Sequence, residues 1–244
     1  EEGKRNILYF GAVNYETWVW VNGKEMRHHV GGFTPFNFDV TDALKDGNNV
    51  IIIKADNKRN KDNVPTQIFD WWNYGGITRD VLLAEVDDSY VEDYFLQLQK
   101  PAASQMGNKP TKTLNFWAKL NQAQAGEKIS VSIPELKIKQ TAITNAEGFV
   151  KLDIKINKLQ LWSPSNPKLY KVEILHSKAK ASNQQESISD EIAFRTIETR
   201  GKQILLNGEP IFLKGISIHE EKPFTQGRCN NAQDADTLLS WAKQ

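Results

Sequence analysis

Residues 203–220 constrain the fold of this chain more than any other segment. They read as a short strand, an Asn207-Gly208 turn and a buried strand over residues 211–218, followed directly by His219 and Glu220. A polar loop and a helix over residues 234–243 come next, which makes one βα unit. One such unit cannot bury its own parallel strand, because parallel strands need neighbouring strands and covering helices. We therefore expect these residues to begin a domain that the 244 residues do not complete.

The charge balance argues against two classes of partner. Lys and Arg total 31 against 30 Asp and Glu, a net charge of +1, so no bulk positive field recruits nucleic acid or an anionic membrane. No apolar run approaches the roughly 20 residues of a membrane span. A hydrophobic content of 39% with seven Trp suffices for packed cores. The single Cys229 excludes an internal disulfide and leaves the cellular compartment open, with a periplasmic or extracellular location favoured over the cytoplasm.

Residues 1–88 are predicted to form a jelly-roll-like β-sandwich. Asn22-Gly23 is the dipeptide that favours a type I′ hairpin turn, and Phe36 and Phe38 alternate with polar residues as in a half-buried strand. The connection over residues 56–77 is long, and loops of that length are uncommon unless they are functional. Further strands are expected over residues 7–12, 17–21, 50–55 and 79–86.

Residues 89–198 are predicted to form an immunoglobulin-like β-sandwich, because short strand-like runs recur there over about 100 residues. Polar loops are expected over residues 101–110 and 177–186. Residues 199–244 then hold the βα unit. The expected strands of the sandwich cover residues 94–98, 114–120, 129–133, 149–156, 170–175 and 192–197.

An aromatic loop around Asp70 is the first candidate site. A carboxylate accepts hydrogen bonds from sugar hydroxyls, and the flat rings of Trp71, Trp72 and Tyr74 could cover the apolar face of a sugar. The alternative is a sandwich corner, in which the indoles join the core and Asp70 makes local turn bonds.

His219 and Glu220 form the second candidate, because they follow the expected strand where a barrel would build its active site. A structural histidine is the alternative. Glu220 and Glu221 are a poor catalytic pair, since glycosidase carboxylates face a sugar about 5 to 9.5 Å apart and adjacent strand residues point in opposite directions. A solvated acidic loop is the better interpretation.

A metal site or cofactor is not expected. His28 and His29 are adjacent and diverge on a strand, and no further His, Cys or acidic cluster completes a ligand set. Cys229 lies in a polar stretch without a cysteine partner and is interpreted as a plain thiol.

Taken in order, these segments resemble glycoside hydrolase family 2, the family of β-galactosidases and β-glucuronidases. Three segments are similar to its sugar-binding jelly roll: residues 11–23 (GAVNYETWVWVNG), 31–41 (GGFTPFNFDVT) and 70–81 (DWWNYGGITRDV). Two resemble the end of its immunoglobulin-like domain: residues 161–170 (LWSPSNPKLY) and 194–198 (FRTIE). Residues 206–220 resemble the first strand of its TIM barrel. The jelly roll is expected to be incomplete at its start, because Ile7 already matches a middle strand.

The resemblance implies roles for two residues. Asp70 matches an aspartate that reaches from the jelly roll into the sugar pocket, and His219 matches a histidine that contacts the sugar after the first barrel strand. Both are expected to bind substrate, with Trp71, Trp72, Tyr74 and Glu220 lining the pocket. The family usually has Gly-x-Asn-Arg or similar before this histidine, whereas residues 215–218 here are Gly-Ile-Ser-Ile.

The expected function is that of part of a retaining β-glycosidase, most simply a β-galactosidase. In the family, one Glu acts as acid/base and another as nucleophile, both at the ends of later barrel strands. The 244 residues are therefore expected to hold neither and to be inactive alone. The alternatives are a β-glucuronidase or β-mannosidase parent, a free-standing carbohydrate-binding module, and an adhesion or scaffolding sandwich pair. A homo-oligomer would assemble through surfaces that the sequence does not identify.

Overall fold

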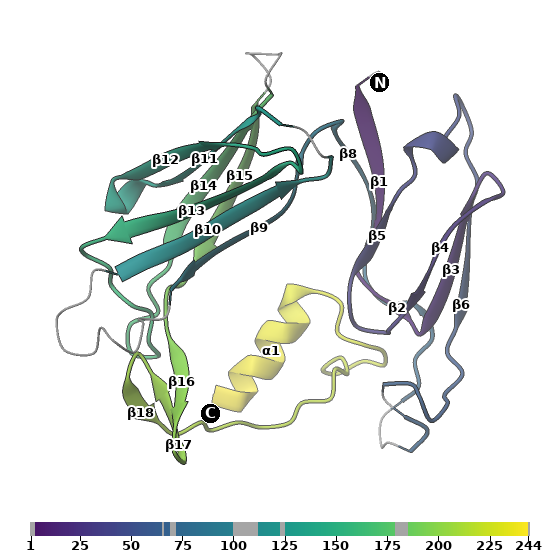
Figure 1. The fold of residues 1–244 in the computed structure, drawn as a ribbon. Helices are drawn as coiled ribbons and strands as arrows, with labels where there is room; N and C mark the ends of the chain where they lie inside the picture. Colours follow the sequence, from purple (N-terminus) through teal and green to yellow (C-terminus); the bar gives the residue numbers. More distant parts are fainter. Residues whose placement is uncertain are drawn as a thin grey trace. The chain divides into compact units, whose positions relative to one another are not determined.

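The computed structural model describes residues 3–64, 66–68, 72–99, 112–122, 125–178 and 185–243. These residues form two compact units, which are described separately (Figure 1). The first combines residues 1–88 with residues 214–244, and the second comprises residues 89–213.

The first unit contains a β-sandwich, as expected. Two antiparallel sheets with the strand orders β5-β1-β8 and β4-β3-β6 send side chains into one core, which joins Phe10 of β1, Val19 of β3 and Phe36 of β5. A short pair, β2-β7, and the 3-10 turn η1 (Thr41–Ala43) complete it. The strands are β1 (Lys4–Phe10), β2 (Val13–Asn14), β3 (Glu16–Val21), β4 (Lys24–Val30), β5 (Phe36–Asp39), β6 (Ile51–Asp56), β7 (Gly76–Ile77) and β8 (Val81–Asp87).

The sequence pattern of β3 explains which face of this strand packs against the core of the sandwich. Val19 and Val21 are buried while Trp18 and Trp20 are half-exposed, which is the period-two alternation of a strand with one face on the core. The turn that follows has positive φ at both central residues, 52° at Asn22 and 83° at Gly23. A type I′ hairpin requires this geometry, so the predicted turn is confirmed.

Among its described residues, the second unit contains a sandwich of seven strands, with sheet orders β13-β10-β9 and β12-β11-β14-β15. Its core includes Phe116 of β10, Ile129 of β11 and Tyr170 of β14, all buried. This is the architecture expected for residues 89–198. The strands are β9 (Val91–Leu98), β10 (Lys112–Leu120), β11 (Lys128–Ile133), β12 (Ile138–Ile143), β13 (Phe149–Ile156), β14 (Tyr170–Ser177) and β15 (Gln185–Ile192), with a 3-10 turn η3 (Pro134–Leu136).

Two strands of this sandwich differ from the prediction: β12, which was not predicted, and β15. The strand expected over residues 192–197 is wrong, because β15 ends at Ile192 and the next strand begins at Ile197. β15 begins at Gln185, at the end of the predicted loop over residues 177–186. It pairs with β14 on one side and lies at the edge of its sheet. Charged residues are common on edge strands and weaken the alternation that sequence reading detects.

The segment that opened the sequence analysis is only partly as expected. A three-stranded sheet joins β16 (Ile197–Arg200), β17 (Gln203–Leu206) and β18 (Glu209–Ile211), with a turn at Asn207-Gly208. The predicted buried strand over residues 211–218 is wrong: residues 212–218, all described, form no strand, and 86% of Phe212 is exposed. A parallel strand is not stable without neighbours to pair with. The predicted helix is confirmed as α1 (Ala232–Lys243).

Among the described residues, no helix is both long enough and apolar enough to span a membrane.

Candidate functional site

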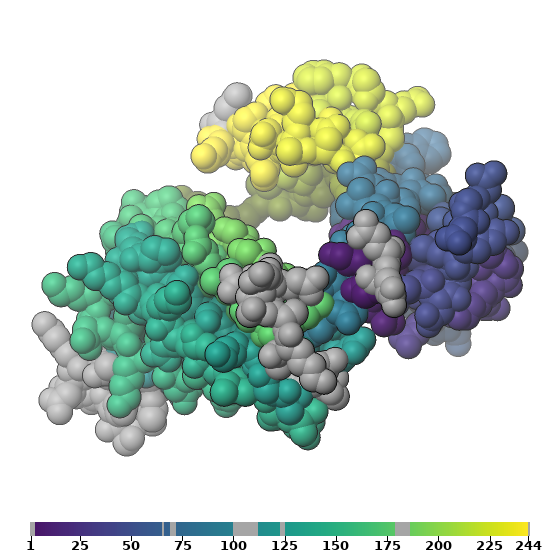
Figure 2. All heavy atoms as spheres, turned by 90° about the horizontal axis from the view of Figure 1, so that it is seen from above, coloured from purple at the N-terminus to yellow at the C-terminus, as the bar shows by residue number. Residues whose placement is uncertain are grey.

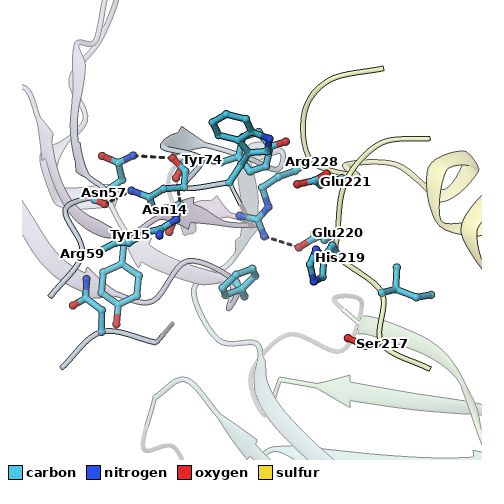
Figure 3. A pocket seen from close by; sticks show the side chains of 15 residues that line it. Asn14, Tyr15, Asn57, Arg59, Tyr74, Ser217, His219, Glu220, Glu221 and Arg228 are labelled. Atoms are coloured by element: carbon cyan, nitrogen blue, oxygen red, sulfur yellow. Dashed lines mark hydrogen bonds and ion pairs between the residues drawn. The ribbon is translucent and has the colours of Figure 1, made fainter. Parts of the chain in front are cut away.

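A pocket of about 270 Å³ opens in the first unit, where two distant parts of the sequence meet (Figure 3). One group of lining residues comes from β2 and the loops around residues 33, 57–63 and 72–74, and the other comes from the C-terminal segment. Figure 3 shows His219 and Glu220 on one side of the pocket and Asn14 and Tyr15 on the other. The lining residues are Asn14, Tyr15, Phe33, Asn57, Arg59, Asn63, Trp72, Asn73, Tyr74, Ser217, Ile218, His219, Glu220, Glu221 and Arg228.

Side-chain amides organise the sandwich side of the pocket. The Nδ2 group of Asn14 donates a hydrogen bond to the Tyr74 carbonyl. Asn57 and Asn73 donate to each other's backbone carbonyls, at 3.3 and 2.9 Å. Because amides present both donors and acceptors, they can order these loops and still offer polar atoms to a ligand.

The aromatic loop contributes two of its predicted residues to the pocket. Trp72 lines it with 75% of its surface exposed, and Tyr74 lines it half-buried. The alternative in which this indole joins the sandwich core therefore does not hold for Trp72. Asp70 and Trp71 lie outside the described residues, so their predicted roles stay predictions.

His219 and Glu220 both line the same pocket as Trp72 and Tyr74. The His219 side chain is exposed, whereas Glu220 is half-buried. Arg79 donates from Nη2 to Oε1 of Glu220 at 2.9 Å, and Arg228 donates from Nη2 to Oε2 at 2.6 Å. The prediction of a solvated acidic loop is therefore wrong for Glu220.

The two arginines determine the charge state of Glu220. Burial by itself would raise the pKa of this carboxyl, but the hydrogen bonds and charges of Arg228 and Arg79 outweigh burial and lower the pKa below its usual value. Glu220 is thus ionised at neutral pH. A group held in this way accepts hydrogen bonds but is a poor proton donor.

Sequence reasoning did not single out Asn14, Arg79 or Arg228. Asn14 and Arg79 fall within segments that carry the family resemblance, so their positions were visible but their roles were not. Arg228 lies in a polar loop with no local pattern, and its contacts in the folded chain reveal it.

The described residues hold no group of three or more His, Cys, Asp or Glu arranged to bind a metal. His28 stacks on Trp18 with ring centroids 4.6 Å apart, and His29 stacks on Phe36 at 4.0 Å. Burial lowers the pKa of His29. Both rings therefore take part in packing.

Two family descriptions match the chain. Residues 1–87 match the sugar binding domain of glycosyl hydrolases family 2, and residues 91–195 match a second domain described as glycosyl hydrolases family 2. A β-galactosidase of Thermoanaerobacter pseudethanolicus is 29% identical over 97% of this chain and 33% of its own length. The chain thus spans about a third of this curated relative.

Solved structures are similar over nearly the whole chain. The β-glucuronidase of Lactobacillus rhamnosus is 28% identical with a TM-score of 0.77, over 99% of this chain and 41% of that one. The β-glucuronidase of Bifidobacterium dentium shares the fold with a TM-score of 0.82 at 23% identity, over 98% of this chain and 45% of that one. With matches to both family domains in sequence order, the chain belongs to glycosyl hydrolase family 2.

Proposed function

We propose that this chain forms one wall of the sugar-binding pocket of a retaining β-glycosidase, most simply a β-galactosidase. The observation that carries the proposal is the shared pocket: Trp72 and Tyr74 line it together with His219, which lies far away in the sequence. An exposed indole, amide groups and an imidazole around one cavity suit a sugar, which presents hydroxyls at its edges and C–H groups on its faces.

Within this proposal His219 donates to or accepts from a sugar hydroxyl, and Trp72 and Tyr74 cover the ring. Asp70 and Trp71, which adjoin Trp72 in the sequence, reach the same sugar.

The chain divides into a jelly-roll domain over residues 1–88, an immunoglobulin-like domain over residues 89–198 and the start of a barrel over residues 199–244.

The 244 residues are proposed to supply sugar contacts to the pocket without hydrolysing a glycoside. Retaining hydrolysis needs two carboxyl groups about 5 to 5.5 Å apart, one of them protonated. Among the described residues that line the pocket, the carboxylates are the adjacent Glu220 and Glu221. Glu220 is ionised and held by two arginines. We place the acid/base and the nucleophile in a longer protein that contains this chain, because the chain spans about a third of the β-galactosidase that it matches.

A panel of substrates tests the proposal. The 244-residue chain and the longer protein are each assayed on aryl β-galactoside, β-glucuronide and β-mannoside. Turnover by the longer protein with none by the chain is the expected result, and the fastest substrate identifies the sugar. A longer protein that is inert on every β-glycoside would contradict the proposal.

Substitution of His219 tests the pocket itself. In the longer protein, His219→Ala is expected to lower kcat/KM by about 10- to 100-fold. This is the effect of losing one hydrogen bond between the imidazole and a sugar hydroxyl. Trp72→Ala should also lower it, whereas Trp117→Ala, which removes a stacked indole from the second unit, should not. If calorimetry finds instead that the chain alone binds oligosaccharides with submillimolar affinity, a free-standing binding module becomes the better description.

A further inference from the structure

Three segments of the first unit converge on one ion-pair cluster beside the pocket. Glu220 forms ion pairs with two arginines. Arg79 precedes β8, and Arg228 follows Glu220 in the C-terminal segment. Both arginines also contact Phe33 in the β4–β5 loop. Nη1 of Arg79 donates to the Phe33 carbonyl at 3.3 Å, and the Arg228 guanidinium lies 4.5 Å from the Phe33 ring centroid. In Figure 2 the yellow C-terminal residues lie against blue residues of this unit.

The backbone holds Arg79 close to the sandwich. The Gly11 amide donates to the Asp80 carbonyl at 2.8 Å. A Cβ at Gly11 would come within 2.9 Å of the Arg79 Cβ, a separation that real side chains do not reach. Glycine at this position therefore permits the approach that directs Arg79 toward Glu220.

Because Arg228 is buried, its guanidinium needs the Glu220 carboxylate as a partner. Only 7% of the Arg228 side chain is exposed, and a buried guanidinium without a carboxylate partner is strongly unfavourable. The surrounding backbone is closed by hydrogen bonds from the Lys222 amide to the Gly227 carbonyl and from the Cys229 amide to the Glu220 carbonyl. Glu220 is thus fixed at both its side chain and its backbone.

His219 directly precedes this fixed residue and lines the pocket. We propose that Glu220 is a positioning residue which, through Arg79 and Arg228, anchors the C-terminal segment to the sandwich and so sets the place of His219 opposite Asn14. This inference rests on the proposed function for its catalytic consequence. The anchoring itself concerns only contacts within the first unit.

The kinetic test uses the longer protein with the best substrate found above. Glu220→Gln keeps the shape of the side chain but removes the charge between the two arginines. We expect kcat/KM to fall about tenfold, mostly through KM, because a misplaced His219 loses ground-state binding. Glu220→Asp should recover part of the loss. Glu92→Gln, which removes an exposed ion pair with Lys119 in the second unit, is the matched control and should have no effect.

A double-mutant cycle separates positioning from general destabilisation. If Glu220 acts through His219, Glu220→Gln should add little to the loss already caused by His219→Ala. If the longer protein is active, additive losses or an unchanged KM in Glu220→Gln would overturn the inference.

Hydrogen exchange of the 244-residue chain tests the anchor without any activity. In Glu220→Gln the amides of Lys222 and Cys229 should exchange at least about tenfold faster, whereas that of Leu8 in β1 should not change. Unchanged protection at Lys222 and Cys229 would overturn the anchor, whether or not the longer protein hydrolyses a glycoside. Lost protection together with an inert longer protein would retain the anchor and reject the proposed function.

Discussion

His176 on β14 is a buried histidine in the interior of the second sandwich, with 2% of its surface exposed. Its Nε2 lies 2.5 Å from Oε2 of Glu127, and its Nδ1 lies 3.3 Å from Oε2 of Glu186. Ser89 donates to the same Glu127 oxygen at 2.8 Å. Burial alone would lower the pKa of His176, but its hydrogen bonds to Glu186 and Glu127 outweigh burial and raise it. The His176 ring, placed between two carboxylates, therefore links β14 to β15 and to the residue before β11.

The raised pKa predicts how the stability of the second unit depends on pH. A pKa that is higher in the folded state contributes stability that is fully present below the ordinary pKa of 6.5 and is lost as pH rises through the folded-state value. The free energy of unfolding should therefore decrease from pH 6 toward pH 9. Urea unfolding, followed by NMR at resonances of β11 and β14, measures this slope.

His176→Ala should lower the stability of the second unit by about 3 kcal/mol at pH 6, because it leaves the buried Glu127 carboxylate without its imidazole partner. It should also abolish most of the slope between pH 6 and 9. His28→Ala, in the other unit, should leave both unchanged. A slope that persists in His176→Ala would assign the pH dependence to other groups.

At the scale of single elements, the β3–β4 hairpin shows how local chemistry determines register. Asn22 does more than supply positive φ: its side chain donates to the Ala43 carbonyl and accepts from the Val50 amide, at 2.8 and 3.0 Å. The turn is thus joined to η1 and to the start of β6. A change of register by one residue would move Val19 and Val21 to solvent, since successive side chains alternate between faces.

Substitution of the turn glycine tests this hairpin. Gly23→Ala is expected to lower the stability of the first unit by about 1 kcal/mol, because φ of 83° is unfavourable for a residue with a Cβ. Gly215→Ala is the matched control, since an added Cβ there would contact nothing within 4 Å. Thermal unfolding of both variants compares the two positions. Equal losses would indicate that backbone conformation at Gly23 is not the cause.

At the scale of the whole molecule, apolar side chains near the C-terminal end are left uncovered. Phe212 and Ile216 are mostly exposed, and α1 has no buried residue among those described. Phe224 makes an edge contact with Trp241 of α1 at 5.3 Å between ring centroids. Such surfaces are typical of regions that another part of a protein covers.

Hydrogen exchange can test whether a barrel covers this segment. In the 244-residue chain, the amides of residues 212–218 should exchange almost without protection, because these residues form no strand. In the longer protein they should become protected by about 100-fold or more, as expected for a strand paired on both sides. Fast exchange in both would contradict the assignment of this segment to a barrel strand.

How well the sequence predicts the structure differs between the secondary-structure elements and the candidate site. The β-sandwiches, the Asn22-Gly23 turn and α1 were predictable because alternation, turn chemistry and helix propensity act over a few residues. The strand over residues 211–218 was predicted from the same kind of pattern and is wrong, because its stability depends on neighbours rather than on its own residues.

The sequence by itself determined the β character, the order of the modules and the family to which this chain belongs. Only the tertiary structure decided which residues meet. Arg79 and Glu220 are 141 positions apart, and neither has a local pattern that indicates the other. His176 and Glu127, which are 49 positions apart, are joined in the same way. Periodicity reports the face on which a side chain lies, whereas an ion pair depends on the packing of distant segments, and that information exists only in the folded chain.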